Sequence, residues 1–155
     1  MIEIEIRGLD RAISIFERAF SDKQKLLMMR ALAIRVERQT KKRINTEKTN
    51  PDGSAWAALA ASTIAAKGHG DILINTRNLV SSIQHFESSS SAEIGSSVFY
   101  GKFQQEGAYN VRSKKNLPIR AFMGVSDANA QELETICANF IAARFNGSVL
   151  GLSLV

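Results

Sequence analysis

Residues 50–59 read NPDGSAWAAL, and they contain the only tryptophan of the 155-residue chain. The stretch opens with a strong turn signal, because proline fixes φ, aspartate bonds to its own backbone and glycine tolerates positive φ. Trp56 follows the turn and leads into an alanine-rich segment. The stretch is an active-site loop, a packing anchor or a contact surface. We favour an anchor that fixes this segment to the body of the domain, with an exposed contact residue as the alternative.

The sequence before this turn predicts a strand and two helices. Isoleucine alternates with glutamate near the N-terminus, a period typical of a half-buried strand, which we place over residues 1–7. Apolar residues at helical spacing then predict helices over 9–44. The first is short and covers 9–20, and the N-terminus of the second is marked by a capping box of Ser21 and Gln24.

The remaining segments complete an α+β fold, a single domain in which long helices pack on a small antiparallel β-sheet. Short apolar runs bounded by polar turns indicate strands, among them 72–74 and a hairpin that turns at Ser88–Ser91. Ser126 or Asp127 caps the last helix. The segments are a loop and alanine-rich stretch over 45–70, a sheet and loop region over 71–125 with a short helix over 98–105 and a polar loop over 108–117, a C-terminal helix over 126–146, and an apolar tail over 147–155.

The chain carries a formal net charge of +5, which is compatible with nucleic acid, an acidic protein or an anionic surface as a partner. Its basic residues gather on one face of the long helix and in the polar loop. A basic helix face is either a solvated surface or a contact with DNA phosphates or an acidic neighbour. The candidates for such a contact are Arg35, Arg38, Lys42, Arg112, Lys114 and Lys115.

The sequence contains no convincing catalytic, cofactor-binding or metal-binding motif, so we predict a protein that is not an enzyme and uses no cofactor. Cys137, the single cysteine, is expected to be a buried thiol. A small hydrolase would rest on Asp52, His69 and Asp71 alone. An aspartate before a glycine is more commonly present for its hydrogen bonds within the turn.

Neither a secretory signal nor a run of about 20 apolar residues is visible, so no membrane partner is expected. A single cysteine also suits a reducing compartment. We therefore expect a soluble protein made in the cytoplasm.

Three segments between residues 50 and 126 carry an ordered set of motifs. They are NPDGSAWAAL with Ser62-Thr63-Ile64 and Lys67; Ile72-Leu73-Ile74-Asn75-Thr76 with Leu79, Ser82 and Ile83; and Ile94-Gly95-Ser96, Tyr100-Gly101 and Gln105-x-Gly107 followed by Leu117-Pro118-Ile119-Arg120-Ala121-Phe122-Met123-Gly124. Together they resemble the phage virion morphogenesis family, the Mu-type group of tail-completion or head–tail joining proteins.

Three positions depart from the family pattern. Arg77 replaces a glycine, Gln104 a histidine and Ala121 a proline. Because arginine tolerates positive φ poorly, a left-handed turn is not expected at Arg77.

The resemblance implies a structural protein of a phage or prophage that acts in virion assembly, at the head–tail junction or in tail completion. It implies partners among further copies of the chain, as a homo-oligomer or a ring, and among neck, connector and tail proteins. Non-specific contact with packaged DNA is a further option. Such a protein is expected in the host cytoplasm during assembly and in the virion afterwards. The alternative, from the charge, is a stand-alone basic nucleic-acid-binding module.

Four residues within these motifs are candidates for a structural or interaction role: Trp56, Tyr100, Arg120 and Phe122. Phe122 is expected in the core, and Tyr100 is a core aromatic or has its hydroxyl at the surface. Arg120 is expected to pair with a carboxylate, with an exposed position beside Pro118 as the alternative.

Overall fold

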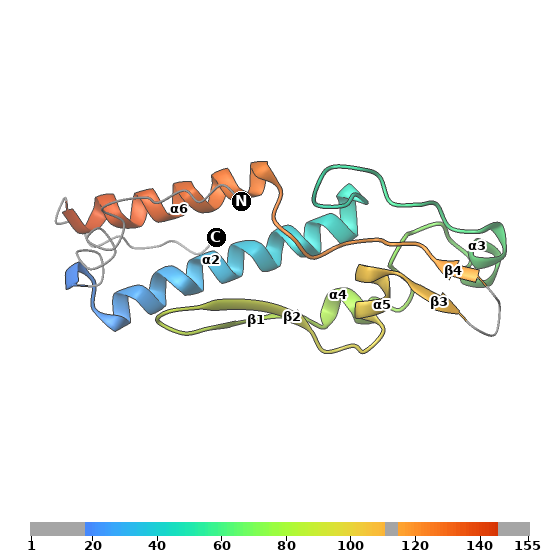
Figure 1. The fold of residues 1–155 in the computed structure, drawn as a ribbon, viewed down its shortest axis with the longest axis horizontal. Helices are drawn as coiled ribbons and strands as arrows, with labels where there is room; N and C mark the ends of the chain where they lie inside the picture. Colours follow the sequence, from blue (N-terminus) through green and yellow to red (C-terminus); the bar gives the residue numbers. More distant parts are fainter. Residues whose placement is uncertain (1–17, 111–114, 146–155) are drawn as a thin grey trace, which may run out of the picture.

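A computed structural model describes residues 18–110 and 115–145 (Figure 1). Its elements are α2 (Asp22–Lys42), the π-helix η1 (Arg43–Glu47), α3 (Ala61–Lys67), α4 (Asn78–Ser81), β1 (Ile83–Glu87), β2 (Ala92–Ser96), α5 (Gly101–Glu106), β3 (Ala108–Asn110), β4 (Lys115–Leu117) and α6 (Asp127–Phe145). The predicted strand over 1–7 and the tail over 147–155 lie outside the described residues. The predicted α+β class, with helices packed on small antiparallel sheets, is confirmed.

Helix α2 begins where the capping box predicts. Ser21 Oγ accepts a hydrogen bond from the backbone N–H of Gln24, and the Ser21 N–H donates to Gln24 Oε1 at 2.9 Å. These bonds satisfy backbone donors that the first helical turn leaves without partners. The helix passes into η1 at Arg43 and ends at Lys48, whose φ of 57° turns the chain away from the helix axis.

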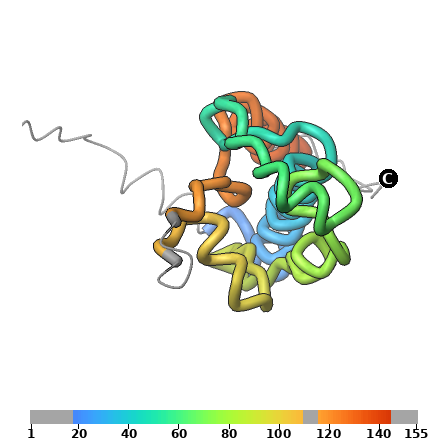
Figure 2. Tube along the Cα trace, turned by 90° about the vertical axis from the view of Figure 1, so that its right-hand side faces the viewer, coloured from blue at the N-terminus to red at the C-terminus, as the bar shows by residue number. Residues whose placement is uncertain are grey.

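Helix α2 lies between two layers, with α6 on one side and the β1–β2 hairpin on the other (Figures 1 and 2). In the antiparallel hairpin, Ile83 lies opposite Ser96, and His85 opposite Ile94. His85 lies on the side that faces α2, because its ring contacts Glu37 of that helix. The hairpin and its serine-rich turn are therefore as predicted, with the Ser88 N–H bonded to the Ser91 carbonyl at 2.8 Å.

Two sequence-based expectations for the middle of the chain are wrong. Residues 72–74 form a turn and not a strand, with Leu73 at a φ of 60°, because a short apolar run indicates burial but does not define a backbone conformation. The region over 108–117 is not a simple loop, since β3 and β4 pair within it, Ala108 opposite Leu117.

The main core lies where the end of α2, the α4–β1 segment and the chain before α6 converge. Its buried side chains are Ile44, Trp56, Leu79, Val80, Ile83 and Phe122. A second contact joins the residues just before α2 to α6, where the rings of Phe20 and Phe140 lie 5.7 Å apart. Within the described ranges, no helix is both long enough and apolar enough to cross a membrane.

Candidate functional site

The chain between β4 and α6 crosses the core as an irregular segment, residues 120–124, which we call the clamped segment. An irregular backbone in a protein interior needs hydrogen-bond partners from outside itself. The Arg43 guanidinium provides two of them: its Nη1 donates to the carbonyl oxygens of Phe122 and Gly124, each at 2.9 Å. Arg43 is 2% exposed, and burial lowers the pKa of its guanidinium. Nothing in the sequence distinguishes Arg43, because it follows Lys41 and Lys42 and looks like part of a basic helix face.

Gln105 of α5 holds the clamped segment from another side. Its Oε1 accepts hydrogen bonds from the N–H groups of Phe122 and Met123, both at 3.0 Å. Its Nε2 donates to the Met123 carbonyl at 2.9 Å. The amide side chain of Gln105 thus supplies both a hydrogen-bond donor and an acceptor, as the backbone of a neighbouring β-strand would do.

The NPDGSAWAAL stretch completes the clamp through Asn50 and Trp56. Asn50 Oδ1 accepts from the Ala121 N–H, and Trp56 Nε1 donates to the Ala121 carbonyl, each at 3.0 Å. Trp56 is 5% exposed within the main core. Its burial agrees with the anchor interpretation and not with an exposed contact residue.

The turn before Trp56 is built from its own hydrogen bonds. Asp52 Oδ1 accepts from the backbone N–H of Ser54 at 2.9 Å and from its hydroxyl, and these bonds lower the pKa of the Asp52 carboxyl. Gly53 has a φ of 84°, a conformation that suits glycine. Asp52 therefore has the turn-forming role. This role weakens the alternative of a small hydrolase, which rested on Asp52 together with His69 and Asp71.

Arg120 connects the clamped segment to the stretch after Trp56. It is 5% exposed, its Nε donates to the Ala57 carbonyl at 3.0 Å, and its Nη2 donates to the Ala58 carbonyl at 3.2 Å. The expected carboxylate partner is wrong: the acceptors that the structure gives this guanidinium are carbonyl oxygens. The backbone at residues 57 and 58 lies outside any helix or strand, and Arg120 gives its carbonyls a donor.

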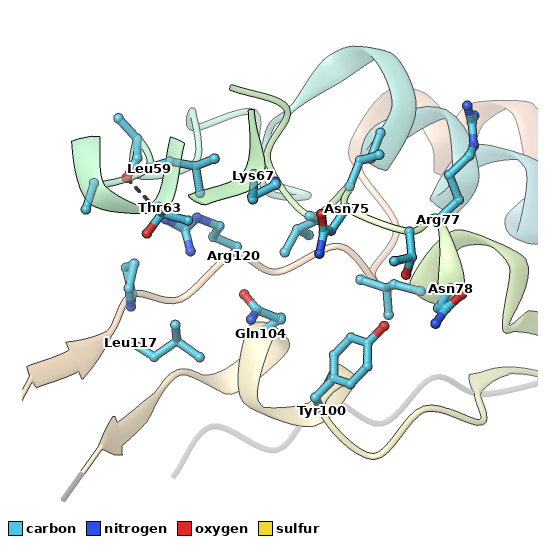
Figure 3. Close-up of a pocket in the computed structure, with 17 residues that line it drawn as sticks. Leu59, Thr63, Lys67, Asn75, Arg77, Asn78, Tyr100, Gln104, Leu117 and Arg120 are labelled. Carbon is cyan, nitrogen blue, oxygen red and sulfur yellow. Dashed lines mark hydrogen bonds between the residues drawn. The ribbon is translucent and has the colours of Figure 1, made fainter. Parts of the chain in front are cut away.

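Beside Arg120 is a groove of about 570 Å³, which we call the Arg120 groove (Figure 3). Lys67, Asn75 and Arg77 lie along one side, and Tyr100, Gln104 and Leu117 along the other. The remaining lining residues include Leu59, Leu73, Ile74, Leu79 and Pro118. None of the described residues that line this groove is acidic.

Arg77 adopts the left-handed conformation that its side chain was expected to prevent, with φ at 62°. It precedes the first turn of α4, and its carbonyl accepts from the Ser81 N–H at 3.0 Å. The α4 side chains Leu79 and Val80 are buried in the main core, and their packing holds this turn against its backbone strain.

Two of the candidate basic residues, Arg35 and Lys42, have carboxylate partners. Arg35 Nε donates to Glu132 Oε2 of α6 at 2.9 Å, and Lys42 lies 3.0 Å from Glu47. Arg38 is exposed. Arg112 and Lys114 lie outside the described residues, and Lys115 is the first residue of β4. Contact with DNA through these residues stays a prediction.

The histidines and the cysteine take part in local contacts. His69 Nδ1 lies 3.2 Å from the Asp71 carboxylate, and His85 contacts Glu37. Cys137 is half-buried, and burial raises the pKa of its thiol. Over residues 18–110 and 115–145, no group of three or more histidine, cysteine or acidic side chains is placed to hold a metal ion.

The fold and the clamp define a small α+β protein in which two sequence motifs are bonded to each other across the core. The chain belongs to the phage virion morphogenesis family, whose sequence profile matches residues 4–142. Comparison with curated proteins and with solved structures gave no match. The family membership makes this chain a phage protein of virion assembly, and the three motifs that suggested the family are those that build the core and the groove.

Proposed function

We propose that this protein is a structural component or factor of virion assembly, and that it acts at the head–tail junction or in tail completion through contacts with itself and with other virion proteins. The observation that carries the proposal is the family match over residues 4–142. In this proposal the protein is not an enzyme, and it is found in the virion or on the assembling particle.

The exposed apolar side chains support a role in protein–protein contacts. Phe99 is 82% exposed on the loop before α5, Phe86 of β1 is 63% exposed, and Tyr109 and Ile119 are each more than half exposed. Large apolar side chains left in water are common at surfaces that bind other proteins. We propose that these side chains form a surface for protein partners.

Deletion of the gene from a phage or prophage that carries it tests the proposal. We expect particles with heads and tails unjoined, or with unfinished tails, in electron micrographs of the lysate. A plasmid copy of the wild-type gene is the control and should restore infectious particles. Normal infectious particles from the deletion would contradict the proposal.

The alternative of a stand-alone nucleic-acid-binding module rests on the net charge of +5. It is weakened because Arg35 and Lys42, which were proposed for DNA contact, have carboxylate partners. Retention of the purified protein on DNA that falls steeply with salt would favour it, since contacts with phosphates release counterions.

A further inference from the structure

Helix α5 has an inner face that is fully used within the chain. Gly101 is buried, and a Cβ atom at this position would lie 3.5 Å from Leu79. Gln105 holds the clamped segment through three hydrogen bonds. Tyr100 and Gln104 line the Arg120 groove (Figure 3). These contacts fix the orientation of α5 and determine which of its side chains face the solvent.

The opposite side of α5 carries exposed apolar and charged side chains, and we call it the Phe99 face. It consists of Phe99, in the turn that leads into the helix, and of Lys102, Phe103 and Glu106. Phe99 is 82% exposed and Phe103 44%, although phenylalanine is normally a core residue. The chain from β2 into α5, in yellow, runs along the lower edge of the molecule in both views (Figures 1 and 2). The face is therefore accessible to a partner.

A hollow of about 320 Å³ adjoins the exposed ring of Phe99. Its lining residues include Val98, Phe99, Lys102, Glu106, Phe122 and Met123. Most of these side chains are apolar, and a cavity of about 150 Å³ with an apolar lining is enough to bind benzene. The hollow therefore has room for the ring of one phenylalanine from outside. An exposed aromatic side chain and a hollow that fits such a side chain thus lie next to each other on one face.

The charges of the Phe99 face complement each other. Lys102 and Glu106 lie one helical turn apart, so two α5 helices that run antiparallel bring Lys102 of each copy to Glu106 of the other. Within the chain these two charges are 3.9 Å apart with side chains 72% and 62% exposed. Such an exposed pair contributes little, so both charges are available to a partner. A partner with one sign of charge, such as nucleic acid, would be attracted by one residue and repelled by the other.

We propose that the Phe99 face binds the Phe99 face of a second copy of this chain across a two-fold axis. Each Phe99 ring enters the hollow of the other copy, and Lys102 of each copy pairs with Glu106 of the other. Such a contact needs a surface that is complementary to itself, and the adjacent ring and hollow and the two charges meet this condition. The inference rests on the proposed self-assembly. A two-fold contact closes with two copies, so it gives a dimer, and a ring would need a further contact.

Substitution of Phe99 tests the apolar part of the contact. Sedimentation velocity of the full chain over a series of concentrations should show that Phe99→Ser weakens dimerisation by at least about tenfold, because a buried aromatic anchor dominates an interface and each dimer contains it twice. Ile64→Ser, at an exposed apolar position on α3, is the matched control and should dimerise like the wild type. Thermal unfolding of both variants checks that they fold.

Charge reversal tests the two-fold arrangement. Lys102→Glu or Glu106→Lys alone places like charges opposite each other twice in each dimer, so either variant should dimerise at least about tenfold more weakly. In an equimolar mixture, one copy carries two glutamates and the other two lysines at these positions. We therefore expect a heterodimer that neither variant forms alone. Lys23→Glu changes the net charge as Lys102→Glu does but lies on α2, and it should dimerise like the wild type.

Three results would overturn the inference. The wild type could stay monomeric at its highest soluble concentration, or Phe99→Ser could dimerise like the wild type. The mixture of charge variants could also fail to form the heterodimer although each variant alone is folded and dissociated, which would exclude the two-fold pairing of α5. A monomeric wild type whose Phe99→Ser variant fails to complement the gene deletion would instead assign the face to another virion protein. The deletion phenotype tests the proposed function separately, because it does not depend on this dimer.

Discussion

At the scale of single residues, the side chains that hold this protein together are polar or aromatic groups that bond to a backbone without regular structure. Arg43, Gln105 and Trp56 each donate to carbonyls of the clamped segment. A lost partner leaves a buried carbonyl without a donor, which costs more than the lost bond alone. These residues are therefore expected to tolerate substitution less well than an apolar core residue of similar size.

Substitution of Trp56 measures this contribution. Trp56→Ala removes the largest side chain of the core and should lower the free energy of unfolding by about 3–5 kcal/mol in urea denaturation. Trp56→Phe keeps most of the apolar volume and removes the indole N–H, so a smaller loss of about 1–3 kcal/mol is expected from the Ala121 carbonyl left without its donor. A Trp56→Ala protein with unchanged stability that no longer assembles would show that Trp56 belongs to an interface.

At the scale of elements, α2 organises the molecule because both of its sides are used. On one side Arg35 and Gln39 hold Glu132 of α6, with Gln39 Nε2 at 2.6 Å from Glu132 Oε2. On the other side, Glu37 contacts His85 of β1. A two-stranded hairpin is marginal alone, so its stability depends on this packing against α2.

The contact between α2 and the hairpin makes stability depend on pH. Burial by itself would raise the pKa of the Glu37 carboxyl, but hydrogen bonds from Lys41 and His85 outweigh it, and the pKa is lowered from the ordinary value of 4.5. A lowered pKa in the folded state means that the unfolded chain takes up the proton first. The stabilisation by Glu37 is therefore fully present above about pH 4.5, and it is lost as the pH falls through the lowered pKa.

Glu37→Gln tests this contact by urea unfolding at a series of pH values. The wild type should be more stable than Glu37→Gln near neutral pH, and the difference should shrink below about pH 4.5. Glu93→Gln, which removes an exposed carboxylate from β2, is the matched control. A difference between the wild type and Glu37→Gln that is the same at all pH values would rule out this role for Glu37.

At the scale of the whole molecule, several large apolar side chains are exposed to water and lie outside the main core. Phe99 contributes little to folding, because it is 82% exposed and contacts the ring of Tyr100 edge-on at 5.8 Å between centroids. The proposed function gives this surface a use, since a virion assembly protein must bind partners that are absent from the isolated chain.

Phe99→Ser separates folding from assembly. We expect a change in the free energy of unfolding within about 0.5 kcal/mol, as for other exposed positions. The yield of infectious particles should fall when this variant complements the gene deletion. Lys23→Ser, at an exposed position on α2, is the control. Full particle yield with Phe99→Ser would show that Phe99 is not part of a partner surface.

Features that depend on neighbours along the chain could be predicted from the sequence. The capping box at Ser21, the turn at Asp52 and Gly53, the serine-linked hairpin and the start of α6 near Ser126 all depend on local hydrogen bonds and local periodicity. The order of three motifs also indicated the family, which the profile match over 4–142 shows. Burial of Trp56 and Phe122 followed from their size and apolar character.

Contacts between groups that are distant in the sequence became visible in the folded chain. Arg120 bonds to carbonyls 63 and 62 residues away, and Arg43 bonds to carbonyls 79 and 81 residues away. Sequence patterns do not specify which irregular backbone will be buried without partners, and that need decided the roles of both arginines. The left-handed conformation of Arg77 also depends on tertiary packing, because packing across the core outweighs the conformational preference of a single residue. The Arg120 groove likewise forms between segments that are distant in the sequence.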